Sequence, residues 1–132
     1  PLYSLFRALL DPELVAQWLG PDGFGLEIDH YDYRSGGSFR YANTDGEDRY
    51  VFSGVFHTVR DSELVIQTFE FEGFPDVVSL ETIGFESLAN GRSRIVSRVV
   101  FPSVEARDGM VESGMEQGLS EGYARLDGLL AS

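Results

Sequence analysis

The chain has 132 residues, of which 42% are hydrophobic and 13% aromatic, so it can bury a core of its own and is expected to form a single domain over residues 1–132. Its formal net charge of −12 repels phosphate backbones and anionic headgroups, which argues against nucleic-acid and membrane partners. With no cysteine and no apolar run long enough to span a bilayer, the sequence carries no disulfide framework and is typical of a cytoplasmic protein.

Two short helices are predicted at the start of the chain. The first is indicated by apolar residues at helical spacing: Leu2, Leu5, Phe6 and Leu9. Asp11, Pro12 and Glu13 then form the pattern of an N-cap, a proline at the first helical position and an acidic first turn. The second helix is predicted to end at Gly20-Pro21.

An antiparallel sheet is predicted next. From residue 26 to about residue 101 the chain breaks into short runs rich in β-branched and aromatic residues. The turn signals between these runs are Ser35-Gly36-Gly37, Asp45-Gly46, Asp61-Ser62, residues 73–76 and Asn90-Gly91. Residues 103–130 then keep apolar side chains at helical spacing and predict one long amphipathic C-terminal helix, so the fold class is α+β.

Treating each tight turn as a two-residue loop predicts how the central strands pair. The resulting pairs are Tyr41 with Tyr50, Phe39 with Phe52, Gly54 with Phe69 and Phe56 with Gln67. One face of these strands is therefore strongly aromatic and is expected to lie inward. The other face is polar, includes His57 and is expected to contact solvent.

The same treatment of Asn90-Gly91 predicts the two faces of the last hairpin. The less charged face, which we assign inward, carries Leu80, Thr82, Gly84, Ser97, Val99 and Phe101. The other face holds Glu81, Arg94 and Arg98 and is assigned to solvent. The inward set fits either a close-packed core or a cavity wall with a few hydrogen-bonding groups, and both interpretations stay open.

Glycine recurs every four residues in the predicted C-terminal helix, at Gly114, Gly118 and Gly122. Each glycine costs a helix about 1 kcal/mol relative to alanine, so a compensating reason is expected. Either this stripe lets the helix approach the sheet closely, or it leaves space for a ligand.

Three segments of the chain resemble a known superfamily. They are residues 11–21 (DPELVAQWLGP), residues 35–41 (SGGSFRY) and residues 116–127 (EQGLSEGYARLD). Together they are similar to the START-like SRPBCC superfamily, and within it to the heat-shock-protein-90 ATPase activator-like family of small bacterial proteins. The resemblance covers essentially the whole chain.

This resemblance implies a helix-grip fold, in which a curved antiparallel sheet wraps around a long C-terminal helix. It also implies a hydrophobic cavity between sheet and helix, which in relatives holds lipids, polyketides or other apolar molecules. Members of the family normally have a strand before the first helix, whereas this chain begins in that helix. One edge of the sheet is therefore expected to be missing from the chain.

Functions of different classes follow from the resemblance. The first is non-enzymatic binding of a small hydrophobic or aromatic ligand. Its cavity would be lined by Trp18, Phe39, Tyr41, Tyr50, Phe52, Phe69, Phe71, Leu80, Thr82, Ser97, Met110, Gly114, Met115 and Gly118. The second is a protein-interaction module acting beside a chaperone, with a homodimer also considered. A weaker third is a polyketide cyclase or dehydratase, which would need titratable groups converging inside the cavity.

No catalytic, metal or cofactor site is predicted. His30 and His57 each lie alone in a strand-like run, without a second ligand at metal-binding spacing, and both are expected to have surface or structural roles. Strict alternation along a strand would place Asp29 on the face opposite His30 and Asp32, which argues against a metal site there. The chain is therefore expected to act without enzymatic turnover.

Overall fold

The computed structural model describes residues 2–19, 23–112 and 115–131. Its elements, in chain order, are α1 (Leu2–Leu10), α2 (Pro12–Trp18), β1 (Gly25–Tyr31), β2 (Ser38–Asp45), β3 (Asp48–Arg60), β4 (Leu64–Phe71), β5 (Val78–Ser87), the 3₁₀ helix η1 (Ala89–Gly91), β6 (Ser93–Val100), α3 (Val104–Glu112) and α4 (Met115–Ala131). The predicted order of helices and strands is confirmed. The helix predicted over residues 103–130 is instead described as two helices, α3 and α4.

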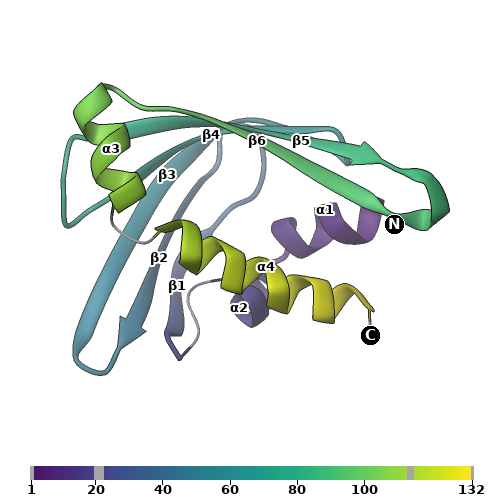
Figure 1. Ribbon diagram of the computed structural model, residues 1–132, viewed down its shortest axis with the longest axis horizontal. Helices are drawn as coiled ribbons and strands as arrows, with labels where there is room; N and C mark the ends of the chain where they lie inside the picture. Colours follow the sequence, from purple (N-terminus) through teal and green to yellow (C-terminus); the bar gives the residue numbers. More distant parts are fainter. Residues whose placement is uncertain (1, 20–22, 113–114, 132) are drawn as a thin grey trace.

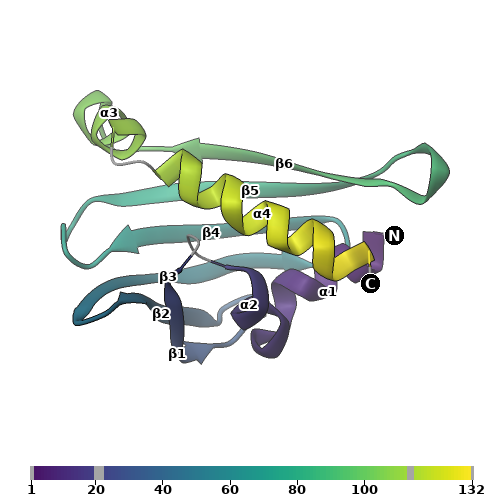
Figure 2. The ribbon, with the colours of Figure 1, turned by 60° about the horizontal axis from the view of Figure 1, so that its bottom comes forward.

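The strands form one antiparallel six-stranded sheet in the order β1-β2-β3-β4-β5-β6, without crossovers. Figure 1 shows this sheet curving over α4, with α1 and α2 on the same concave side. In Figure 2, α4 runs obliquely across the concave face, while α3 stands at one end of the sheet. This is the helix-grip arrangement. None of the described helices is long and apolar enough to cross a membrane.

Helices α1 and α2 meet at a capped corner. The Asp11 carboxylate accepts a hydrogen bond of 2.9 Å from the Glu13 amide, with Pro12 at the start of α2, which confirms the predicted N-cap. The buried Trp18 indole donates to the Ala8 carbonyl at 3.1 Å and so joins the two helices. Helix α2 ends at Trp18, and the predicted terminator Gly20-Pro21 lies outside the described residues.

The β2–β3 hairpin turns one residue later than predicted. Asp45 pairs with Asp48, so Gly46 and Glu47 form the loop. Gly46 has a φ of 62°, and the first loop position of such a hairpin requires a positive φ that glycine adopts without strain. The observed pairs are Tyr41 with Phe52 and Phe39 with Gly54. Because the register moves by two residues, the aromatic face keeps its predicted composition.

The β3–β4 hairpin reaches its predicted pairing by a different route. Arg60 pairs with Leu64, so the loop has three residues rather than two, and a bulge at His57 then shifts the register back. Phe56 therefore pairs with Gln67, as predicted. A bulge takes up one extra residue on one strand, so the two departures cancel over the centre of the sheet.

The last hairpin has a longer loop than predicted. Ser87 pairs with Ser93, so the loop spans residues 88–92 and contains η1. Asn90 and Gly91 have positive φ angles of 62° and 70°, but they lie within the 3₁₀ turn instead of forming a two-residue loop. The predicted pairing of β5 with β6 is therefore wrong by one residue.

A slip of one residue moves every side chain of a strand to the opposite face. The observed pairs are Leu80 with Val100, Thr82 with Arg98, Glu81 with Val99 and Ile83 with Ser97. Glu81 also pairs with Gln67, which pairs with the buried Phe56, so Glu81 faces inward. Leu80 and Thr82 face outward, contrary to the prediction.

The core is an aromatic layer on the concave face of the sheet. Its buried members are Leu5, Phe6, Ala8, Trp18, Tyr33, Phe39, Tyr41, Phe56, Val65, Phe69, Phe85 and Leu126. Phe6 of α1 contacts Tyr33 and Phe85 edge to face, with ring centroids 5.9 Å and 5.3 Å away. Such contacts stabilise aromatic pairs beyond their buried area, so α1 is fixed against the sheet.

Gly54 marks the tightest packing in this layer. A Cβ atom at this position would overlap the Thr68 carbonyl oxygen and lie 2.7 Å from ring atoms of Phe39. Gly84, on β5, offers a matched control, because a Cβ there would come no closer than 3.8 Å to the Val96 carbonyl oxygen.

We expect Gly54→Ala to lower the free energy of unfolding by about 2–3 kcal/mol, because the added methyl group overpacks a filled interior. Gly84→Ala should change it by no more than about 0.5 kcal/mol. Urea unfolding of both variants beside the wild type measures this difference. Equal destabilisation of the two variants would refute the close approach at Gly54.

Candidate functional site

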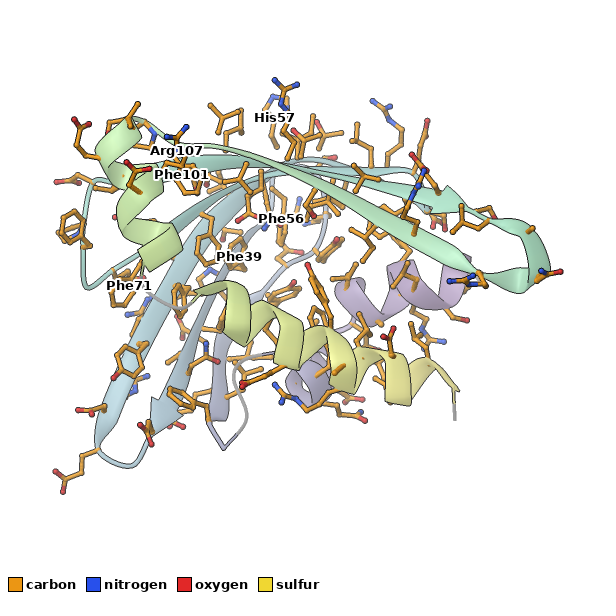
Figure 3. The ribbon with its side chains drawn as sticks, in the orientation of Figure 1. Phe39, Phe56, His57, Phe71, Phe101 and Arg107 are labelled. Atoms are coloured by element: carbon orange, nitrogen blue, oxygen red, sulfur yellow. The ribbon has the colours of Figure 1, made fainter. Side chains whose placement is uncertain are left out.

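The candidate site lies on the concave face of the sheet, opposite α4. The structure places the six predicted strand aromatics on this face: Phe39, Tyr41, Tyr50, Phe52, Phe69 and Phe71. They touch one another, with Phe52 centred 5.2 Å from Phe69 and 5.3 Å from Phe71. Figure 3 shows Phe39 and Phe56 pointing to the side of α4, while His57 points to the opposite side.

Burial of these aromatics decreases along the strands. Phe39 and Phe69 are only 3% and 8% exposed, whereas Phe52 and Phe71 are half-buried and Tyr50 is 36% exposed. The aromatic wall is therefore closed at the centre of the sheet and accessible toward the β2–β3 hairpin.

Helix α4 reaches the sheet through Tyr123. The Tyr123 ring stacks on Trp18 with centroids 6.1 Å apart, and its hydroxyl is close enough to Ser97 of β6 for the serine to offset part of the rise in the Tyr123 pKa. The predicted residues Trp18 and Ser97 are thus connected by a tyrosine that sequence analysis did not select. The sequence signal for Tyr123 was its position within residues 116–127, one of the segments that resemble the superfamily.

The remaining predicted residues do not join this group. Leu80, 44% exposed, and Thr82 lie on the outer face of the sheet. Gly114 and the surroundings of Met110, Met115 and Gly118 lie outside the part of the chain that the structure describes.

Glu81 is the residue that sequence analysis assigned to solvent and the structure places inside. It lies on the concave face of β5, between Gln67 of β4 and Val99 of β6. Burial raises the pKa of Glu81 from 4.5 to about 7, because the charged carboxylate loses hydration. None of the described residues forms an ion pair or a hydrogen bond with this carboxylate.

The charge of Glu81 acts on tyrosines from three different elements. Burial raises the pKa values of Tyr31 on β1, Tyr41 on β2 and Tyr123 on α4, and the negative charge of Glu81 raises them further. Their hydroxyl groups therefore stay protonated at neutral pH. The cyclase or dehydratase interpretation required titratable groups that converge inside the fold; the influence of Glu81 on these tyrosines is the feature of the concave face that bears on it.

Asn43 adds an unpartnered acceptor to the same face. It is 8% exposed, and no described residue donates a hydrogen bond to its Oδ1 atom. It pairs with the exposed Tyr50 at the accessible end of the aromatic wall. Buried acceptors in native proteins are usually satisfied, so a water molecule or a ligand donor is expected here.

Both histidines lie on the convex face, where each contacts polar side chains of neighbouring residues. A bulge in β1 places Asp29 beside His30, with 3.3 Å between Asp29 Oδ2 and His30 Nδ1. The prediction that these two side chains lie on opposite faces of the strand is therefore wrong. Arg40 pairs with Glu72 at 2.9 Å and with Asp29 at 3.7 Å, and it holds the pKa of Glu72 below its usual range. His30, Arg40 and Glu72 line a shallow hollow of about 370 Å³, in which the charges of Arg40 and Glu72 are already paired.

Each histidine contacts a neighbouring hydroxyl group. His57 and His30 are exposed, and they hydrogen-bond Thr58 at 2.8 Å and Ser38 at 3.0 Å. Within the described part of the chain, no three His, Cys, Asp or Glu side chains are grouped closely enough to hold a metal ion.

The family is decided by a model that matches residues 1–131 and is described as Activator of Hsp90 ATPase homolog 1-like protein. The chain belongs to this family. A comparison of the Hsp90-activator-like chain with curated proteins gave no match.

Solved bacterial structures share the fold of this Hsp90-activator-like domain. A Rhodobacter sphaeroides crystal structure has 24% identity and a TM-score of 0.89, covering 98% of this chain and 85% of that one. Protein Ms6760 from Mycobacterium smegmatis has 23% identity and a TM-score of 0.88, covering 98% and 83%. An Arthrobacter aurescens solution structure has 23% identity and a TM-score of 0.87, covering 98% and 79%. At these identities the likeness shows the fold.

The half-buried, inward-facing position of Glu81 predicts a pH-dependent loss of stability. Its pKa is about 7 in the folded protein against an ordinary value of 4.5, so the folded state holds this proton more tightly than the unfolded state. The free-energy cost of ionising Glu81 in the folded protein is absent below the ordinary pKa, grows as the pH rises from the ordinary pKa to the folded pKa, and levels off at about 3 kcal/mol above it.

We therefore expect Glu81→Gln to be more stable than the wild type at about pH 8 and to lose about 2 kcal/mol of this advantage at about pH 5.5. The control Glu86→Gln removes a carboxylate that pairs with Arg94 on the outer face of the same strand and should show no such gain. Urea unfolding at both pH values provides the measurement. A Glu81→Gln advantage that is independent of pH would contradict the raised pKa of Glu81.

Proposed function

We propose that the protein binds a small hydrophobic or aromatic ligand between the concave face of its sheet and α4. The observation that carries this proposal is the aromatic wall that stays partly accessible on the inward face. Phe52 and Phe71 are half-buried and Tyr50 is 36% exposed, although a filled core would cover all three. Binding sites for apolar ligands combine such a wall with a few polar groups. Here these are Asn43, which pairs with Tyr50, and Glu81, which lies farther along the concave face at the level of Phe56.

Binding is favoured over catalysis because it needs only these wall residues. Proton transfer would require substrate atoms within hydrogen-bond reach of Glu81 and in a productive orientation. The family match extends over residues 1–131, so the sheet and the helix that would enclose the ligand both belong to the shared domain. We infer that a ligand enters near the β2–β3 hairpin, where the wall is most exposed.

Titration with the uncharged dye N-phenyl-1-naphthylamine tests ligand binding, with dye emission and the fluorescence of the single tryptophan, Trp18, as readouts. We expect saturable binding, and Phe71→Ala should weaken it by about 10-fold, since one aromatic contact contributes about 1.4 kcal/mol. The control Val55→Ala truncates a residue on the opposite face that is 51% exposed and should retain wild-type affinity. Absence of saturable binding by the wild type would reject the proposal.

A second candidate function is action on the Hsp90 ATPase, which the family description names. It is favoured by an apolar row on the convex face. Leu80 pairs with Val100 and, through Thr68, adjoins Val55, and these three apolar residues are 44%, 53% and 51% exposed. Contiguous exposed apolar side chains are characteristic of protein-binding surfaces.

If this row contacts the chaperone, the added protein should raise the steady-state ATPase rate of Hsp90. Leu80→Glu should reduce that stimulation by about 10-fold or more, because it buries a charge in the contact. Phe71→Ala, on the concave face, should leave the stimulation intact and serves as the control. An unchanged ATPase rate with the wild-type protein would eliminate this candidate without affecting the ligand-binding proposal.

A further inference from the structure

We propose that the concave site selects protonated organic amines with an aromatic or apolar body, and that the Glu81 carboxylate acts as the counterion of the ligand's ammonium group. This inference rests on the ligand-binding function proposed above and names the class of ligand.

The first argument is that Glu81 has no cationic partner in the described chain. Lysine is absent from the sequence, and several arginines pair with carboxylates elsewhere: Arg34 with Asp32, Arg40 with Glu72, Arg49 with Glu27, Arg60 with Glu63, Arg94 with Glu86 and Arg107 with Asp108. Glu81 is half-buried on the concave face, where its charge has lost part of its hydration, and a carboxylate removed from water is normally paired. A ligand cation would provide the partner that the described residues do not.

The second argument is the aromatic environment of the carboxylate. Tyr31, Tyr41 and Tyr123 are the titratable groups of neighbouring elements whose ionisation responds to the charge of Glu81. All three are neutral at physiological pH, so they do not compete for a cation. Aromatic rings attract ammonium groups through their negative faces, so carboxylate and rings favour the same ligand charge.

The third argument excludes the opposite charge. The net charge of the chain is −12, so its field attracts cations and repels anions. A carboxylate ligand such as a fatty acid would also approach Glu81 without a neutralising partner. An uncharged ligand is tolerated because Glu81 can take up a proton, but only a cationic ligand gains from the ionised carboxylate.

Binding of an amine should therefore be linked to proton release. A cation next to Glu81 stabilises its ionised form and lowers its pKa, so the affinity for an amine should rise with pH. With a pKa of about 7 in the free protein, the ionised fraction, and with it the affinity, should increase about 10-fold between about pH 6 and about pH 8.

Three naphthalenes of similar size separate the effect of charge from that of shape: 1-naphthylmethylamine, 1-naphthalenemethanol and 1-naphthoic acid. Isothermal titration calorimetry at about pH 8 should show that the amine binds about 10-fold or more tightly than the alcohol and that the acid binds most weakly. In Glu81→Gln the preference for the amine over the alcohol should fall to within about 2-fold, and its pH dependence should disappear. Glu86→Gln makes the same change of charge on the outer face of β5 and should keep the preference.

Each outcome distinguishes the two proposals. If the three compounds bind the wild type with equal affinity, or if Glu81→Gln keeps the preference for the amine, the amine inference is overturned and ligand binding stands. If none of the three binds, both proposals are overturned. Unfolding curves of the two glutamine variants, measured in the same buffers, establish that both are folded during the titrations.

Discussion

The contact between the Phe39 ring and the bare backbone of Gly54 is the constraint on which the architecture depends. It lets β2 and β3 carry an aromatic layer without a Cβ atom intruding at the centre of the sheet. From there Phe39 also contacts Tyr31, Tyr41, Phe56 and Phe69. Because this layer fills one face only, α1, α2 and α4 cover the same side, and the sheet curves around them (Figure 1).

The two faces of the sheet consequently differ in their chemistry. On the convex face, Arg40 and its neighbours are charged, exposed to water and mutually paired. On the concave face, Glu81 and the Oδ1 atom of Asn43 have no hydrogen-bonding partner among the described residues. Polar groups placed in this way reduce stability, and departures of this kind are concentrated at functional sites. The binding proposals rest on this asymmetry.

Several predictions from the sequence held because they depended on local chemistry or because a register shift of two residues left the strand faces unchanged. The N-cap at Asp11 follows from the preference of a carboxylate for free helix amides. The aromatic face was recovered although the β2–β3 register was wrong, because a shift of two residues preserves side-chain alternation. The family resemblance and the order of elements likewise agree with the observed fold.

The sequence alone therefore determined the fold class, the helix cap and the aromatic surface that faces α4. Only the tertiary structure decided that Glu81 lies inside and Leu80 outside, because the loop at residues 88–92 is longer than its Asn-Gly signal predicts and an odd slip exchanges the two faces. The bulge that brings Asp29 beside His30 was equally hidden. Loop length and bulges are settled by packing across the whole sheet. Glu81, the residue on which the proposed chemistry of this site depends, was therefore the one that the local sequence pattern placed on the wrong face.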